Sequence, residues 1–282
     1  MKYHFFYNPY SRGFLSKKWV LEPIINRFGK ENIHETLKDP QEMFRKYSKI
    51  IDNDTVVIGL GGDGTLNILV NAFVEKTDKF SLFPCGTANV IVGELGITHD
   101  IYTFLNGLEN AEIIRIDAGD NNGNKFLLCT GLGIDAIAVK KVSNRLKKIF
   151  GPLAYVFSFF RAIFHERVDV KLIVDGDLFT VKSAVIQNFK NYGGSFYFDP
   201  DVSAEDGFLS LIVLEDENKN IFSNLLNIFK RKKAFIKAIH FKELYIEDIN
   251  EKVFFQVDGD ISNNFIRCIK VIPDAIGFVL VK

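Results

Sequence analysis

The sequence predicts an α/β fold in two parts, an N-terminal α/β domain with a parallel sheet and a C-terminal β-sandwich domain. Strand-like and helix-like segments alternate from residue 3 to residue 83, which is typical of a parallel sheet covered by helices on both faces. From residue 111 onward, short runs of alternating apolar residues dominate, which is typical of a β-rich domain. The change occurs without a linker, so we expect domains at residues 1–110 and 111–282 that pack closely around a cleft.

The first half supplies strands that each end in a polar loop or lead into a helix. The predicted strands are residues 3–7, 32–36, 55–59 and 80–83, and the predicted helices are residues 17–27, 40–50 and 65–76. Parallel sheets of this kind bind ligands beyond the carboxyl ends of their strands. The loops that follow the strands are therefore the first candidates for a binding site.

The second half is predicted to be mostly β-strand. The expected strands are residues 113–118, 125–129, 169–174, 178–186, 208–214, 241–246, 253–257, 265–272 and 277–281, with helices at residues 134–163 and 219–238. The dipeptide Asp175-Gly176 lies between two of these runs. Asp-Gly is favoured in two-residue hairpin turns, so we interpret it as structural.

Composition excludes several classes of protein. Lys and Arg together number 35, as do Asp and Glu, so no overall charge favours nucleic acid. The three cysteines, Cys85, Cys129 and Cys268, are far apart and odd in number, which argues against a disulfide framework or a zinc site and favours a reducing cytosol. No window has the ~18 apolar residues that a membrane-spanning helix needs. We expect a cytoplasmic protein that is not integral to a membrane.

The central motif is the glycine-rich turn after the third predicted strand, with the residues Gly61, Gly62, Asp63, Gly64, Thr65, Leu66 and Asn67. Glycines that open a helix let the backbone approach a ligand, and the free N–H groups there bind anions. A carboxylate inside such a turn repels phosphates unless a divalent cation lies between them or the carboxylate accepts a proton. The turn therefore indicates phosphoryl transfer. The alternative is an ordinary turn with Asp63 as the N-cap of the next helix.

Two further loops follow strands in the same half. The first contains Asn8, Ser11 and Arg12, which could hydrogen-bond a nucleotide and neutralise phosphate, and the second contains Gly86, Thr87 and Asn89. In a parallel sheet these loops should converge with residues 61–67 on one edge. Three harmless turns remain the alternative. The convergence predicts a nucleotide-binding site in the first domain.

The second half contains two acidic clusters. Asp258 and Asp260 flank a glycine at the end of a predicted strand, where one of them could take a proton from an attacking hydroxyl. A hairpin turn is the alternative for this pair. Asp199, Asp201, Glu205 and Asp206 form the other cluster, which suits Mg²⁺ or Ca²⁺ or is simply a solvated loop.

Six motifs together resemble the bacterial diacylglycerol kinase and sphingosine kinase type of lipid kinase, which is related more distantly to NAD kinases. They are NPYSRG at residue 8, GGDGTLN at residue 61, PCGTANVIVGELGI at residue 84, GLGIDA at residue 131, FDPDVSAEDGFLSL at residue 198 and QVDGD at residue 256. GGDGT alone would also fit an NAD kinase. The combination is what points to lipid kinases, and it spans nearly the whole chain.

The resemblance implies roles for particular residues. It makes residues 61–67 the phosphate loop and places residues 8–12, Thr36 and Thr87 where similar proteins contact ATP. It also implies a structural Mg²⁺ held by the side chain of Asp206 and by main-chain oxygens of Ser203 and Phe208. The chain departs from the family pattern at three positions, where Ile68 replaces a frequent glutamate, Arg12 a common glycine and Asp260 the usual glutamate.

We therefore predict an ATP-dependent lipid kinase with a diacylglycerol-like or sphingoid acceptor. ATP phosphates would lie on Gly61 to Thr65, Mg²⁺ would bridge them to Asp63, and Asp258 or Asp260 would deprotonate the acceptor. The alternatives are an NAD kinase-like small-molecule kinase and a non-catalytic nucleotide- or lipid-binding protein. A homodimer is left open.

A lipid kinase must reach a membrane surface, and the sequence offers two candidate contacts for peripheral binding at the inner face. The basic residues Lys140, Lys141, Arg145, Lys147 and Lys148 precede an aromatic run, and Lys230, Arg231, Lys232, Lys233 and Lys237 follow an apolar one. Basic residues near an anionic leaflet each contribute roughly 1 kcal/mol to binding. Solvated surface charge is the alternative interpretation of both clusters.

Overall fold

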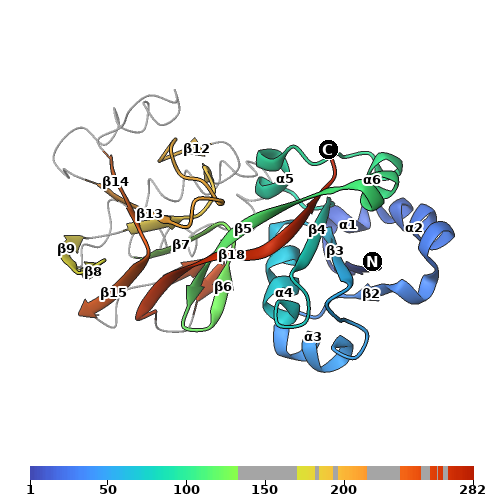
Figure 1. Cartoon of the computed structure of the whole chain (residues 1–282), viewed down its shortest axis with the longest axis horizontal. Coiled ribbons are helices and arrows are strands. Elements are labelled where there is room, and N and C mark those ends of the chain that lie inside the picture. Colours follow the sequence, from blue (N-terminus) through green and yellow to red (C-terminus); the bar gives the residue numbers. More distant parts are fainter. Residues whose placement is uncertain are drawn as a thin grey trace. The chain divides into compact units, whose positions relative to one another are not determined.

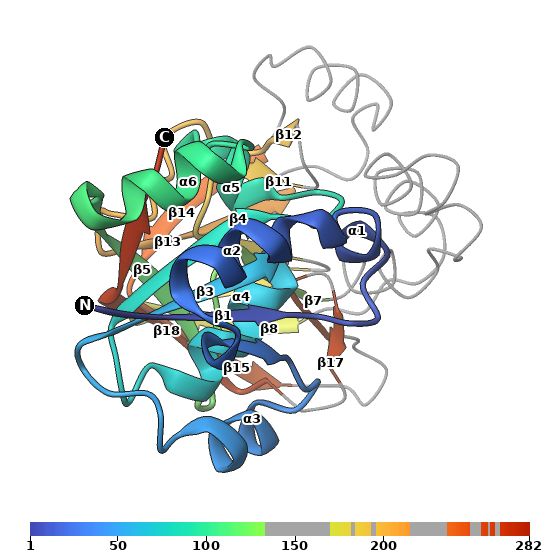
Figure 2. The same cartoon turned by 90° about the vertical axis from the view of Figure 1, so that its right-hand side faces the viewer.

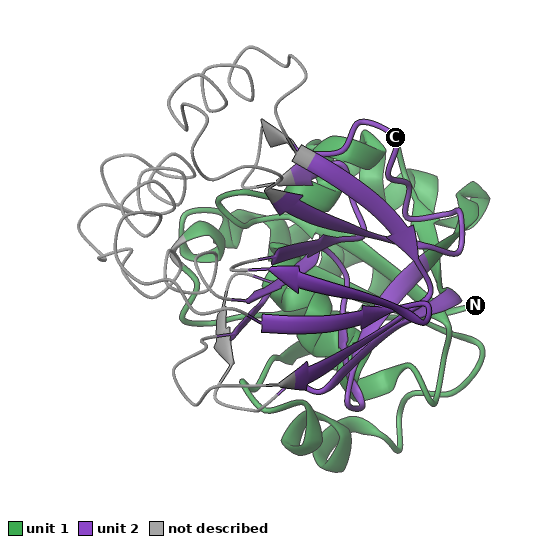
Figure 3. Cartoon of the chain, turned by 90° about the vertical axis from the view of Figure 1, so that its left-hand side faces the viewer, with its two compact units in different colours: residues 1–116, 274–282 green, residues 117–273 purple. Residues whose placement is uncertain are grey.

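The structure is a computed structural model that describes residues 1–132, 170–181, 184–192, 196–214, 236–248, 255–258, 260–262 and 266–282. It divides into two compact units, which Figure 3 colours separately. Unit 1 comprises residues 1–116 and 274–282, and unit 2 comprises residues 117–273. The sequence analysis placed a single boundary at residue 110 and gave the last residues to the second domain. In the structure the last residues belong to unit 1 because they pair with one of its strands.

Unit 1 alternates strands and helices along the chain (Figure 1). Its elements are β1 (Lys2–Tyr7), α1 (Arg12–Leu15), η1 (Lys18–Val20), α2 (Leu21–Phe28), η2 (Lys30–Asn32), β2 (Ile33–Glu35), α3 (Pro40–Tyr47), β3 (Thr55–Gly61), α4 (Asp63–Phe73), β4 (Lys79–Pro84), α5 (Val90–Leu95), α6 (Ile101–Gly107) and η3 (Leu108–Asn110). Strands β5 (Glu112–Asn121) and β18 (Cys268–Leu280) each contain one of the boundaries between the units.

The sheet of unit 1 is parallel, as predicted, with the strand order β2-β1-β3-β4 and the end of β18 beside β4. Strand β3 is buried along its whole length, which explains its continuous apolar run, since a strand covered on both faces has no polar side. Helices α2 and α6 pack together on one side of the sheet, and α3 and α4 pack together on the other (Figure 2). The carboxyl ends of β1, β3 and β4 therefore share one edge.

The described part of unit 2 consists mainly of antiparallel strands. They are β6 (Asn124–Phe126), β7 (Cys129–Leu132), β8 (Val170–Val174), β9 (Asp177–Val181), β10 (Ala184–Gln187), β11 (Asn191–Tyr192), β12 (Phe196–Tyr197), β13 (Leu209–Leu214), β14 (Ile236–Phe241), β15 (Glu243–Asp248), β16 (Phe255–Val257) and β17 (Asp260–Ser262). One sheet has the order β14-β13-β10-β7-β16-β17, and β15, β8 and β9 follow β18 in the other.

One hydrophobic core joins these two sheets into the predicted sandwich. Leu172, Leu244 and Ile269 from one sheet and Ile186 and Leu211 from the other belong to a single buried cluster. The Asp175-Gly176 turn joins β8 to β9, with positive φ angles of 47° and 97° at its two residues. Both central residues of a type I′ hairpin turn need positive φ, so the predicted hairpin is confirmed.

Several predicted elements differ from the observed ones. The helix expected at residues 17–27 is divided into η1 and α2, and the strand expected at residues 178–186 is divided into β9 and β10. The two strands expected at residues 265–272 and 277–281 form one strand, β18. Residues 134–163 and most of residues 219–238 lie outside the described residues, but residues 236–238 are strand β14, so the helix prediction is wrong there.

Candidate functional site

Three loops converge at the carboxyl edge of the unit 1 sheet, as the sequence predicts. The Gly61 carbonyl accepts hydrogen bonds from the Cys85 and Gly86 amides at 2.7 and 3.0 Å. Gly13 lies so close to the third loop that a Cβ atom there would stand 1.9 Å from the Cys85 carbonyl oxygen. Lys17 donates to the Pro84 carbonyl at 2.8 Å. The loops after β1, β3 and β4 are therefore held together by main-chain hydrogen bonds, close packing at Gly13 and the Lys17 side chain.

The glycines of the central turn and of the third loop are required for different reasons. A Cβ atom on Gly61 would stand 2.2 Å from the Thr65 hydroxyl oxygen, and one on Gly86 would stand 2.5 Å from the Gly62 Cα. Packing within the protein thus requires these positions to stay small. Gly64, in the first turn of α4, is exposed, and a Cβ atom there would meet nothing within 4 Å. The fold gives no reason for glycine at residue 64, whereas a ligand on the N-terminus of α4 would.

Asp63 caps a helix other than its own. Its carboxylate accepts from the amides of Val90 at 2.9 Å and Ile91 at 3.1 Å, at the N-terminus of α5. Asn89 at that helix start has a left-handed backbone and provides no side-chain cap. Burial raises the pKa of Asp63, and the hydrogen bonds from Val90 and Ile91 oppose this rise. The sequence alternative, a cap on α4, is thus replaced by a cap on α5.

The other predicted nucleotide residues surround this edge. Asn8 accepts from the Tyr10 amide at 2.9 Å, and Thr36 is buried with its amide bonded to the Tyr7 carbonyl at 2.8 Å. Thr87 is exposed. The Asn89 side chain donates to the Gly86 carbonyl, and its own oxygen is buried with no hydrogen-bond partner among the residues that the structure describes. Ser11 precedes α1, which begins at Arg12. Gly62 and Thr65 lie at the start of α4, and within that helix Asn67 accepts a hydrogen bond from Asn71. Their roles toward a nucleotide stay predictions.

In unit 2, Asp258 binds the main chain at residues 127–129, where the backbone turns between β6 and β7. Its carboxylate accepts from the amides of Leu127 at 3.0 Å and of Leu128 and Cys129 at 2.9 Å each. Its own amide donates to the Cys129 carbonyl at 2.8 Å, and its φ angle is 46°. Aspartate tolerates this left-handed conformation better than most residues. The strand predicted at residues 125–129 is interrupted here because these amides bond to Asp258 rather than to a neighbouring strand.

Asp260 begins β17 and pairs with Val257 of β16 in an antiparallel hairpin. The hairpin that the sequence analysis held as an alternative is therefore present around the acid pair. The side chain of Asp260 lies outside the described residues. Three main-chain amides bond to the Asp258 carboxylate. The catalytic roles of Asp258 and Asp260 stay predictions.

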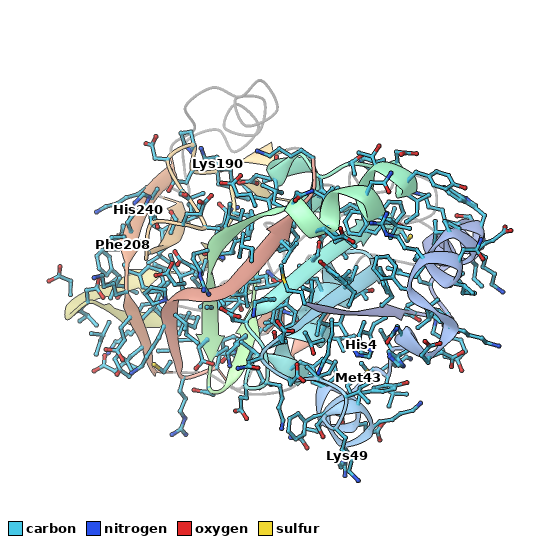
Figure 4. All side chains as sticks on the ribbon, turned by 45° about the vertical axis from the view of Figure 1, so that its right-hand side comes forward. His4, Met43, Lys49, Lys190, Phe208 and His240 are labelled. Atoms are coloured by element: carbon cyan, nitrogen blue, oxygen red, sulfur yellow. The ribbon has the colours of Figure 1, made fainter. Side chains whose placement is uncertain are left out.

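The acidic loop at residues 199–208 is organised by hydrogen bonds. Asp199 is buried and accepts from the Ser210 hydroxyl at 2.6 Å, the Asp201 amide at 2.9 Å and His240 at 2.7 Å (Figure 4 labels His240 and Phe208). Burial alone would raise the pKa of Asp199, but these hydrogen bonds outweigh it and lower the pKa. Asp199 is therefore committed to protein partners, as a buried carboxylate generally must be.

The residues predicted to hold Mg²⁺ lie at the end of the same loop. Asp206 accepts from the Phe208 amide at 2.9 Å, and the Ser203 hydroxyl accepts from the Glu205 amide at 3.3 Å. Among the described residues, no three or more His, Cys, Asp or Glu side chains gather as a metal site. A set of one carboxylate and two main-chain oxygens fits the hard ligands that Mg²⁺ prefers. This site stays a prediction.

Two buried polar residues, Asp117 and Asn188, were not predicted from the sequence to have a structural role. The Asp117 carboxylate accepts from the Gly207 amide at 2.7 Å, and the Asn188 side chain donates to the carbonyls of Asp117 and Leu127 at 2.8 and 2.9 Å. Both tie the acidic loop and the Asp258 corner to their surroundings. In the sequence, only the position of each residue, a polar residue next to or inside an apolar run, could have indicated such a role.

The expected membrane contacts fall mostly outside the described residues. Lys237 is the exception, in β14 with its ammonium 5.7 Å from the centre of the Phe179 ring. In the part of the chain that the structure describes, no helix is long and apolar enough to span a bilayer. Cys85, Cys129 and Cys268 form no disulfide in the described part of the chain, and burial raises the pKa of Cys85 to about 11.

Comparison with known proteins agrees with this architecture. The model of the diacylglycerol kinase catalytic domain matches residues 2–120, and that of the YegS C-terminal NAD kinase beta sandwich-like domain matches residues 129–280. Fold and matches together define the class of protein, an α/β domain of the diacylglycerol kinase catalytic type followed by a β-sandwich domain. The chain belongs to the diacylglycerol kinase family that combines these two domains.

Individual relatives support the assignment. Diacylglycerol kinases of Staphylococcus aureus strains bovine RF122 / ET3-1 and JH9 are each 27% identical to this chain, the first over 77% of this chain and 72% of its own length, the second over 80% and 74%. A solved diacylglycerol kinase structure from Bacillus anthracis str. Sterne matches with a TM-score of 0.76 at 22% identity, covering 99% of this chain and 96% of that one. This last likeness establishes the fold.

Proposed function

We propose that this protein is an ATP-dependent lipid kinase that transfers the γ-phosphate of ATP to a lipid hydroxyl. The observation that carries the proposal is the open glycine position Gly64 at the N-terminus of α4, where three loops meet on one sheet edge. Such a terminus presents free N–H groups to an anion. The relatives named diacylglycerol kinase supply the choice of acceptor class.

The nucleotide phosphates are proposed to lie on the amides of Gly62, Asp63 and Gly64. Asp63 orients α5 through Val90 and Ile91 and so fixes the loop that carries Thr87. Two donors leave lone pairs on both Asp63 oxygens, which therefore suit a cation that bridges to the phosphates. Mg²⁺, when bound, would neutralise charge on the transferred phosphoryl group.

In unit 2, we assign the proton-accepting role to Asp260. Asp258 is a positioning residue in this proposal, because its oxygens hold the amides of Leu127, Leu128 and Cys129. It fixes the start of the hairpin whose second strand begins at Asp260. Asp206, with the carbonyls of Ser203 and Phe208, is proposed to bind a structural Mg²⁺ that steadies the acidic loop.

A lipid substrate lies in a membrane, so the proposal includes a membrane-contact surface. Contact with an anionic membrane is proposed to run through the basic residues at 230–233. The test is sedimentation with anionic vesicles after Lys230, Arg231, Lys232 and Lys233 are changed to glutamine. Reduced, salt-sensitive binding with retained activity on detergent-dispersed lipid would support the contact, and unchanged binding would exclude it.

The central experiment is incubation with labelled ATP and, separately, diacylglycerol, sphingosine or NAD, followed by separation of the products. Label in a lipid product supports the proposal. Label in NADP would instead indicate an NAD kinase-like enzyme. ATP binding with no transfer to any acceptor would indicate a non-catalytic binding protein.

A further inference from the structure

A row of polar side chains crosses the six-stranded sheet of unit 2. His240, Ser210, Gln187 and Cys129 stand opposite one another in register on β14, β13, β10 and β7. Residues opposite one another in a sheet share a face, and successive residues along a strand alternate faces. Ile186 and Leu211 occupy neighbouring positions and belong to the hydrophobic core. The polar row therefore faces away from that core.

Three members of this row have partners. His240 and Ser210 both bind the Asp199 carboxylate at 2.7 and 2.6 Å, and the Gln256 side-chain nitrogen lies 3.7 Å from the Cys129 sulfur. Gln187 differs from them. Its side chain is fully buried, and neither the amide nitrogen nor the amide oxygen has a hydrogen-bond partner within the described part of the chain.

A buried carboxamide with both polar atoms unpaired destabilises the protein that carries it. An apolar side chain of similar size would suit this buried strand position better, so the glutamine calls for an explanation outside the fold. Side chains that break a local rule of this kind occur preferentially at functional sites. A ligand that supplies the missing partners is the most direct explanation.

The surroundings of Gln187 indicate which ligand this is. Gln187 pairs with Cys129, whose amide is held by Asp258 at 2.9 Å. The next residue, Asn188, bonds the carbonyls of Leu127 and Leu128 through its side chain and its amide, both at 2.9 Å. Gln187 thus lies on the strand beside the segment that Asp258 fixes, close in the sheet to the hairpin of Asp260.

We propose that the carboxamide of Gln187 binds the polar head of the lipid acceptor and thereby sets acceptor specificity, an inference that rests on the proposed kinase function. The amide nitrogen donates to a carbonyl oxygen next to the acceptor hydroxyl. A neutral carboxamide fits a neutral lipid alcohol that carries an ester. Gln187 takes no part in proton transfer.

The test compares wild type with Gln187→Leu on two acceptors in mixed micelles, 1,2-dioleoylglycerol and the matching dialkyl ether, which has the same hydroxyl but no carbonyl. We expect wild type to favour the ester about tenfold in kcat/KM, the scale of one neutral hydrogen bond. In the Leu variant, KM for the ester should rise about tenfold, whereas KM for the ether and KM for ATP should stay unchanged. The ester preference should therefore vanish, as in a double-mutant cycle.

Two measurements separate this role from a structural one. Leu removes unpaired polar atoms, so the Tm of Gln187→Leu should equal or exceed that of wild type. Gln256→Leu is the matched control, since Gln256 is also a buried glutamine of this sheet but has a partner. Its Tm should fall.

Lipid binding is also measured without ATP, as the rise in wild-type Tm caused by dioleoylglycerol micelles over empty micelles. If wild type phosphorylates no lipid, but its Tm still rises with dioleoylglycerol and that of Gln187→Leu does not, the kinase function is refuted and the lipid-binding site stands. An unchanged ester preference and an unchanged lipid-induced rise in Gln187→Leu would overturn the proposal. A fall in Tm of this variant, like that of Gln256→Leu, would also overturn it, because Gln187 would then have a structural partner.

Discussion

Asp63 in unit 1 and Asp258 in unit 2 do similar structural work in different settings. Each lies beside a glycine at the end of a strand, and each uses its carboxylate to bind main-chain amides distant in sequence. Asp63 binds two amides at a helix N-terminus, next to an open glycine position. Asp258 binds three amides at a strand corner, and one of them belongs to Cys129, which pairs with the buried Gln187 on its other side. The comparison shows that an acidic residue in a glycine turn can serve as a fixed support for the backbone, and our proposals assign ligand contact to its neighbours instead.

The largest effect expected from this comparison separates the two late acids. Asp260→Asn should lower kcat by ~10²- to 10⁴-fold, because a general base is lost, and should change Tm little. Asp258→Asn should lower Tm as well, since an amide donor would then face main-chain donors, at a cost of about 1–3 kcal/mol. Steady-state kinetics and thermal unfolding of both variants check this. Equal Tm values for the two would refute the division of roles.

A second prediction tests Asp63. Asp63→Asn should lower turnover by at least ~10²-fold, the scale of a lost electrostatic contributor. Partial loss of the α5 cap should also cost about 1 kcal/mol of unfolding free energy. The measurements are turnover at saturating ATP and chemical denaturation. Turnover within a few-fold of wild type would leave Asp63 as a helix cap alone.

A third prediction separates ligand from fold at Gly64. Gly64→Ala should raise KM for ATP at least about tenfold, because a methyl group enters the space that the phosphates need. Its unfolding free energy should stay equal or rise by about 0.4–1 kcal/mol, since alanine restricts the unfolded chain more than glycine does. Gly93→Ala is the matched control, as Gly93 also lies in a helix with open space at its Cβ position. Normal ATP affinity in Gly64→Ala would remove the main support for the phosphate site.

The smallest effect concerns acid stability, in which the two units differ. In unit 1, His4 and His34 hydrogen-bond each other at 2.9 Å. Burial chiefly lowers both pKa values, with that of His34 at about 4. The unfolded chain thus binds more protons below pH 6.5, so stability should fall from pH 6.5 toward about 4. Asp199 in unit 2 has a lowered pKa, so its contribution should persist there and disappear only below its ordinary value of 3.8.

Thermal unfolding between pH 7 and 4 checks the histidine prediction. His34→Gln should flatten the pH dependence, whereas His99→Gln, at an exposed histidine, should leave it unchanged. A pH profile of His34→Gln that parallels wild type would show that another group causes the acid response.

The sequence predicted the features that depend on local pattern or on a general rule of sheets. The convergence of the loops at residues 8–12, 61–67 and 86–89 follows from the parallel order of β1, β3 and β4. The Asp175-Gly176 hairpin follows from the backbone conformation that its two residues tolerate. Both could be inferred because neither needs a contact between specific distant side chains.

The remaining features arise from long-range contacts that leave no local pattern. Nothing near Asp63 indicates that it caps α5, and nothing near Asp258 indicates that it binds residues 127–129. The same contact interrupts a strand that the apolar pattern predicted as continuous. Gln187 gave the weakest signal, a single polar residue at the end of an apolar run, and only its burial without a partner makes it notable.

The place of β18 has a consequence for how the chain is made. Residues 274–282 complete unit 1, with Gly277 beside Lys79, the Ser81 hydroxyl bonded to the Val279 carbonyl at 2.7 Å and the Thr98 amide bonded to the Val281 carbonyl at 3.0 Å. During synthesis, the edge of β4 that pairs with β18 therefore stays unpaired until all of unit 2 has been translated. Unit 1 is made first but completed last, and a ribosome that stalls within unit 2 leaves a sheet edge open to aggregation.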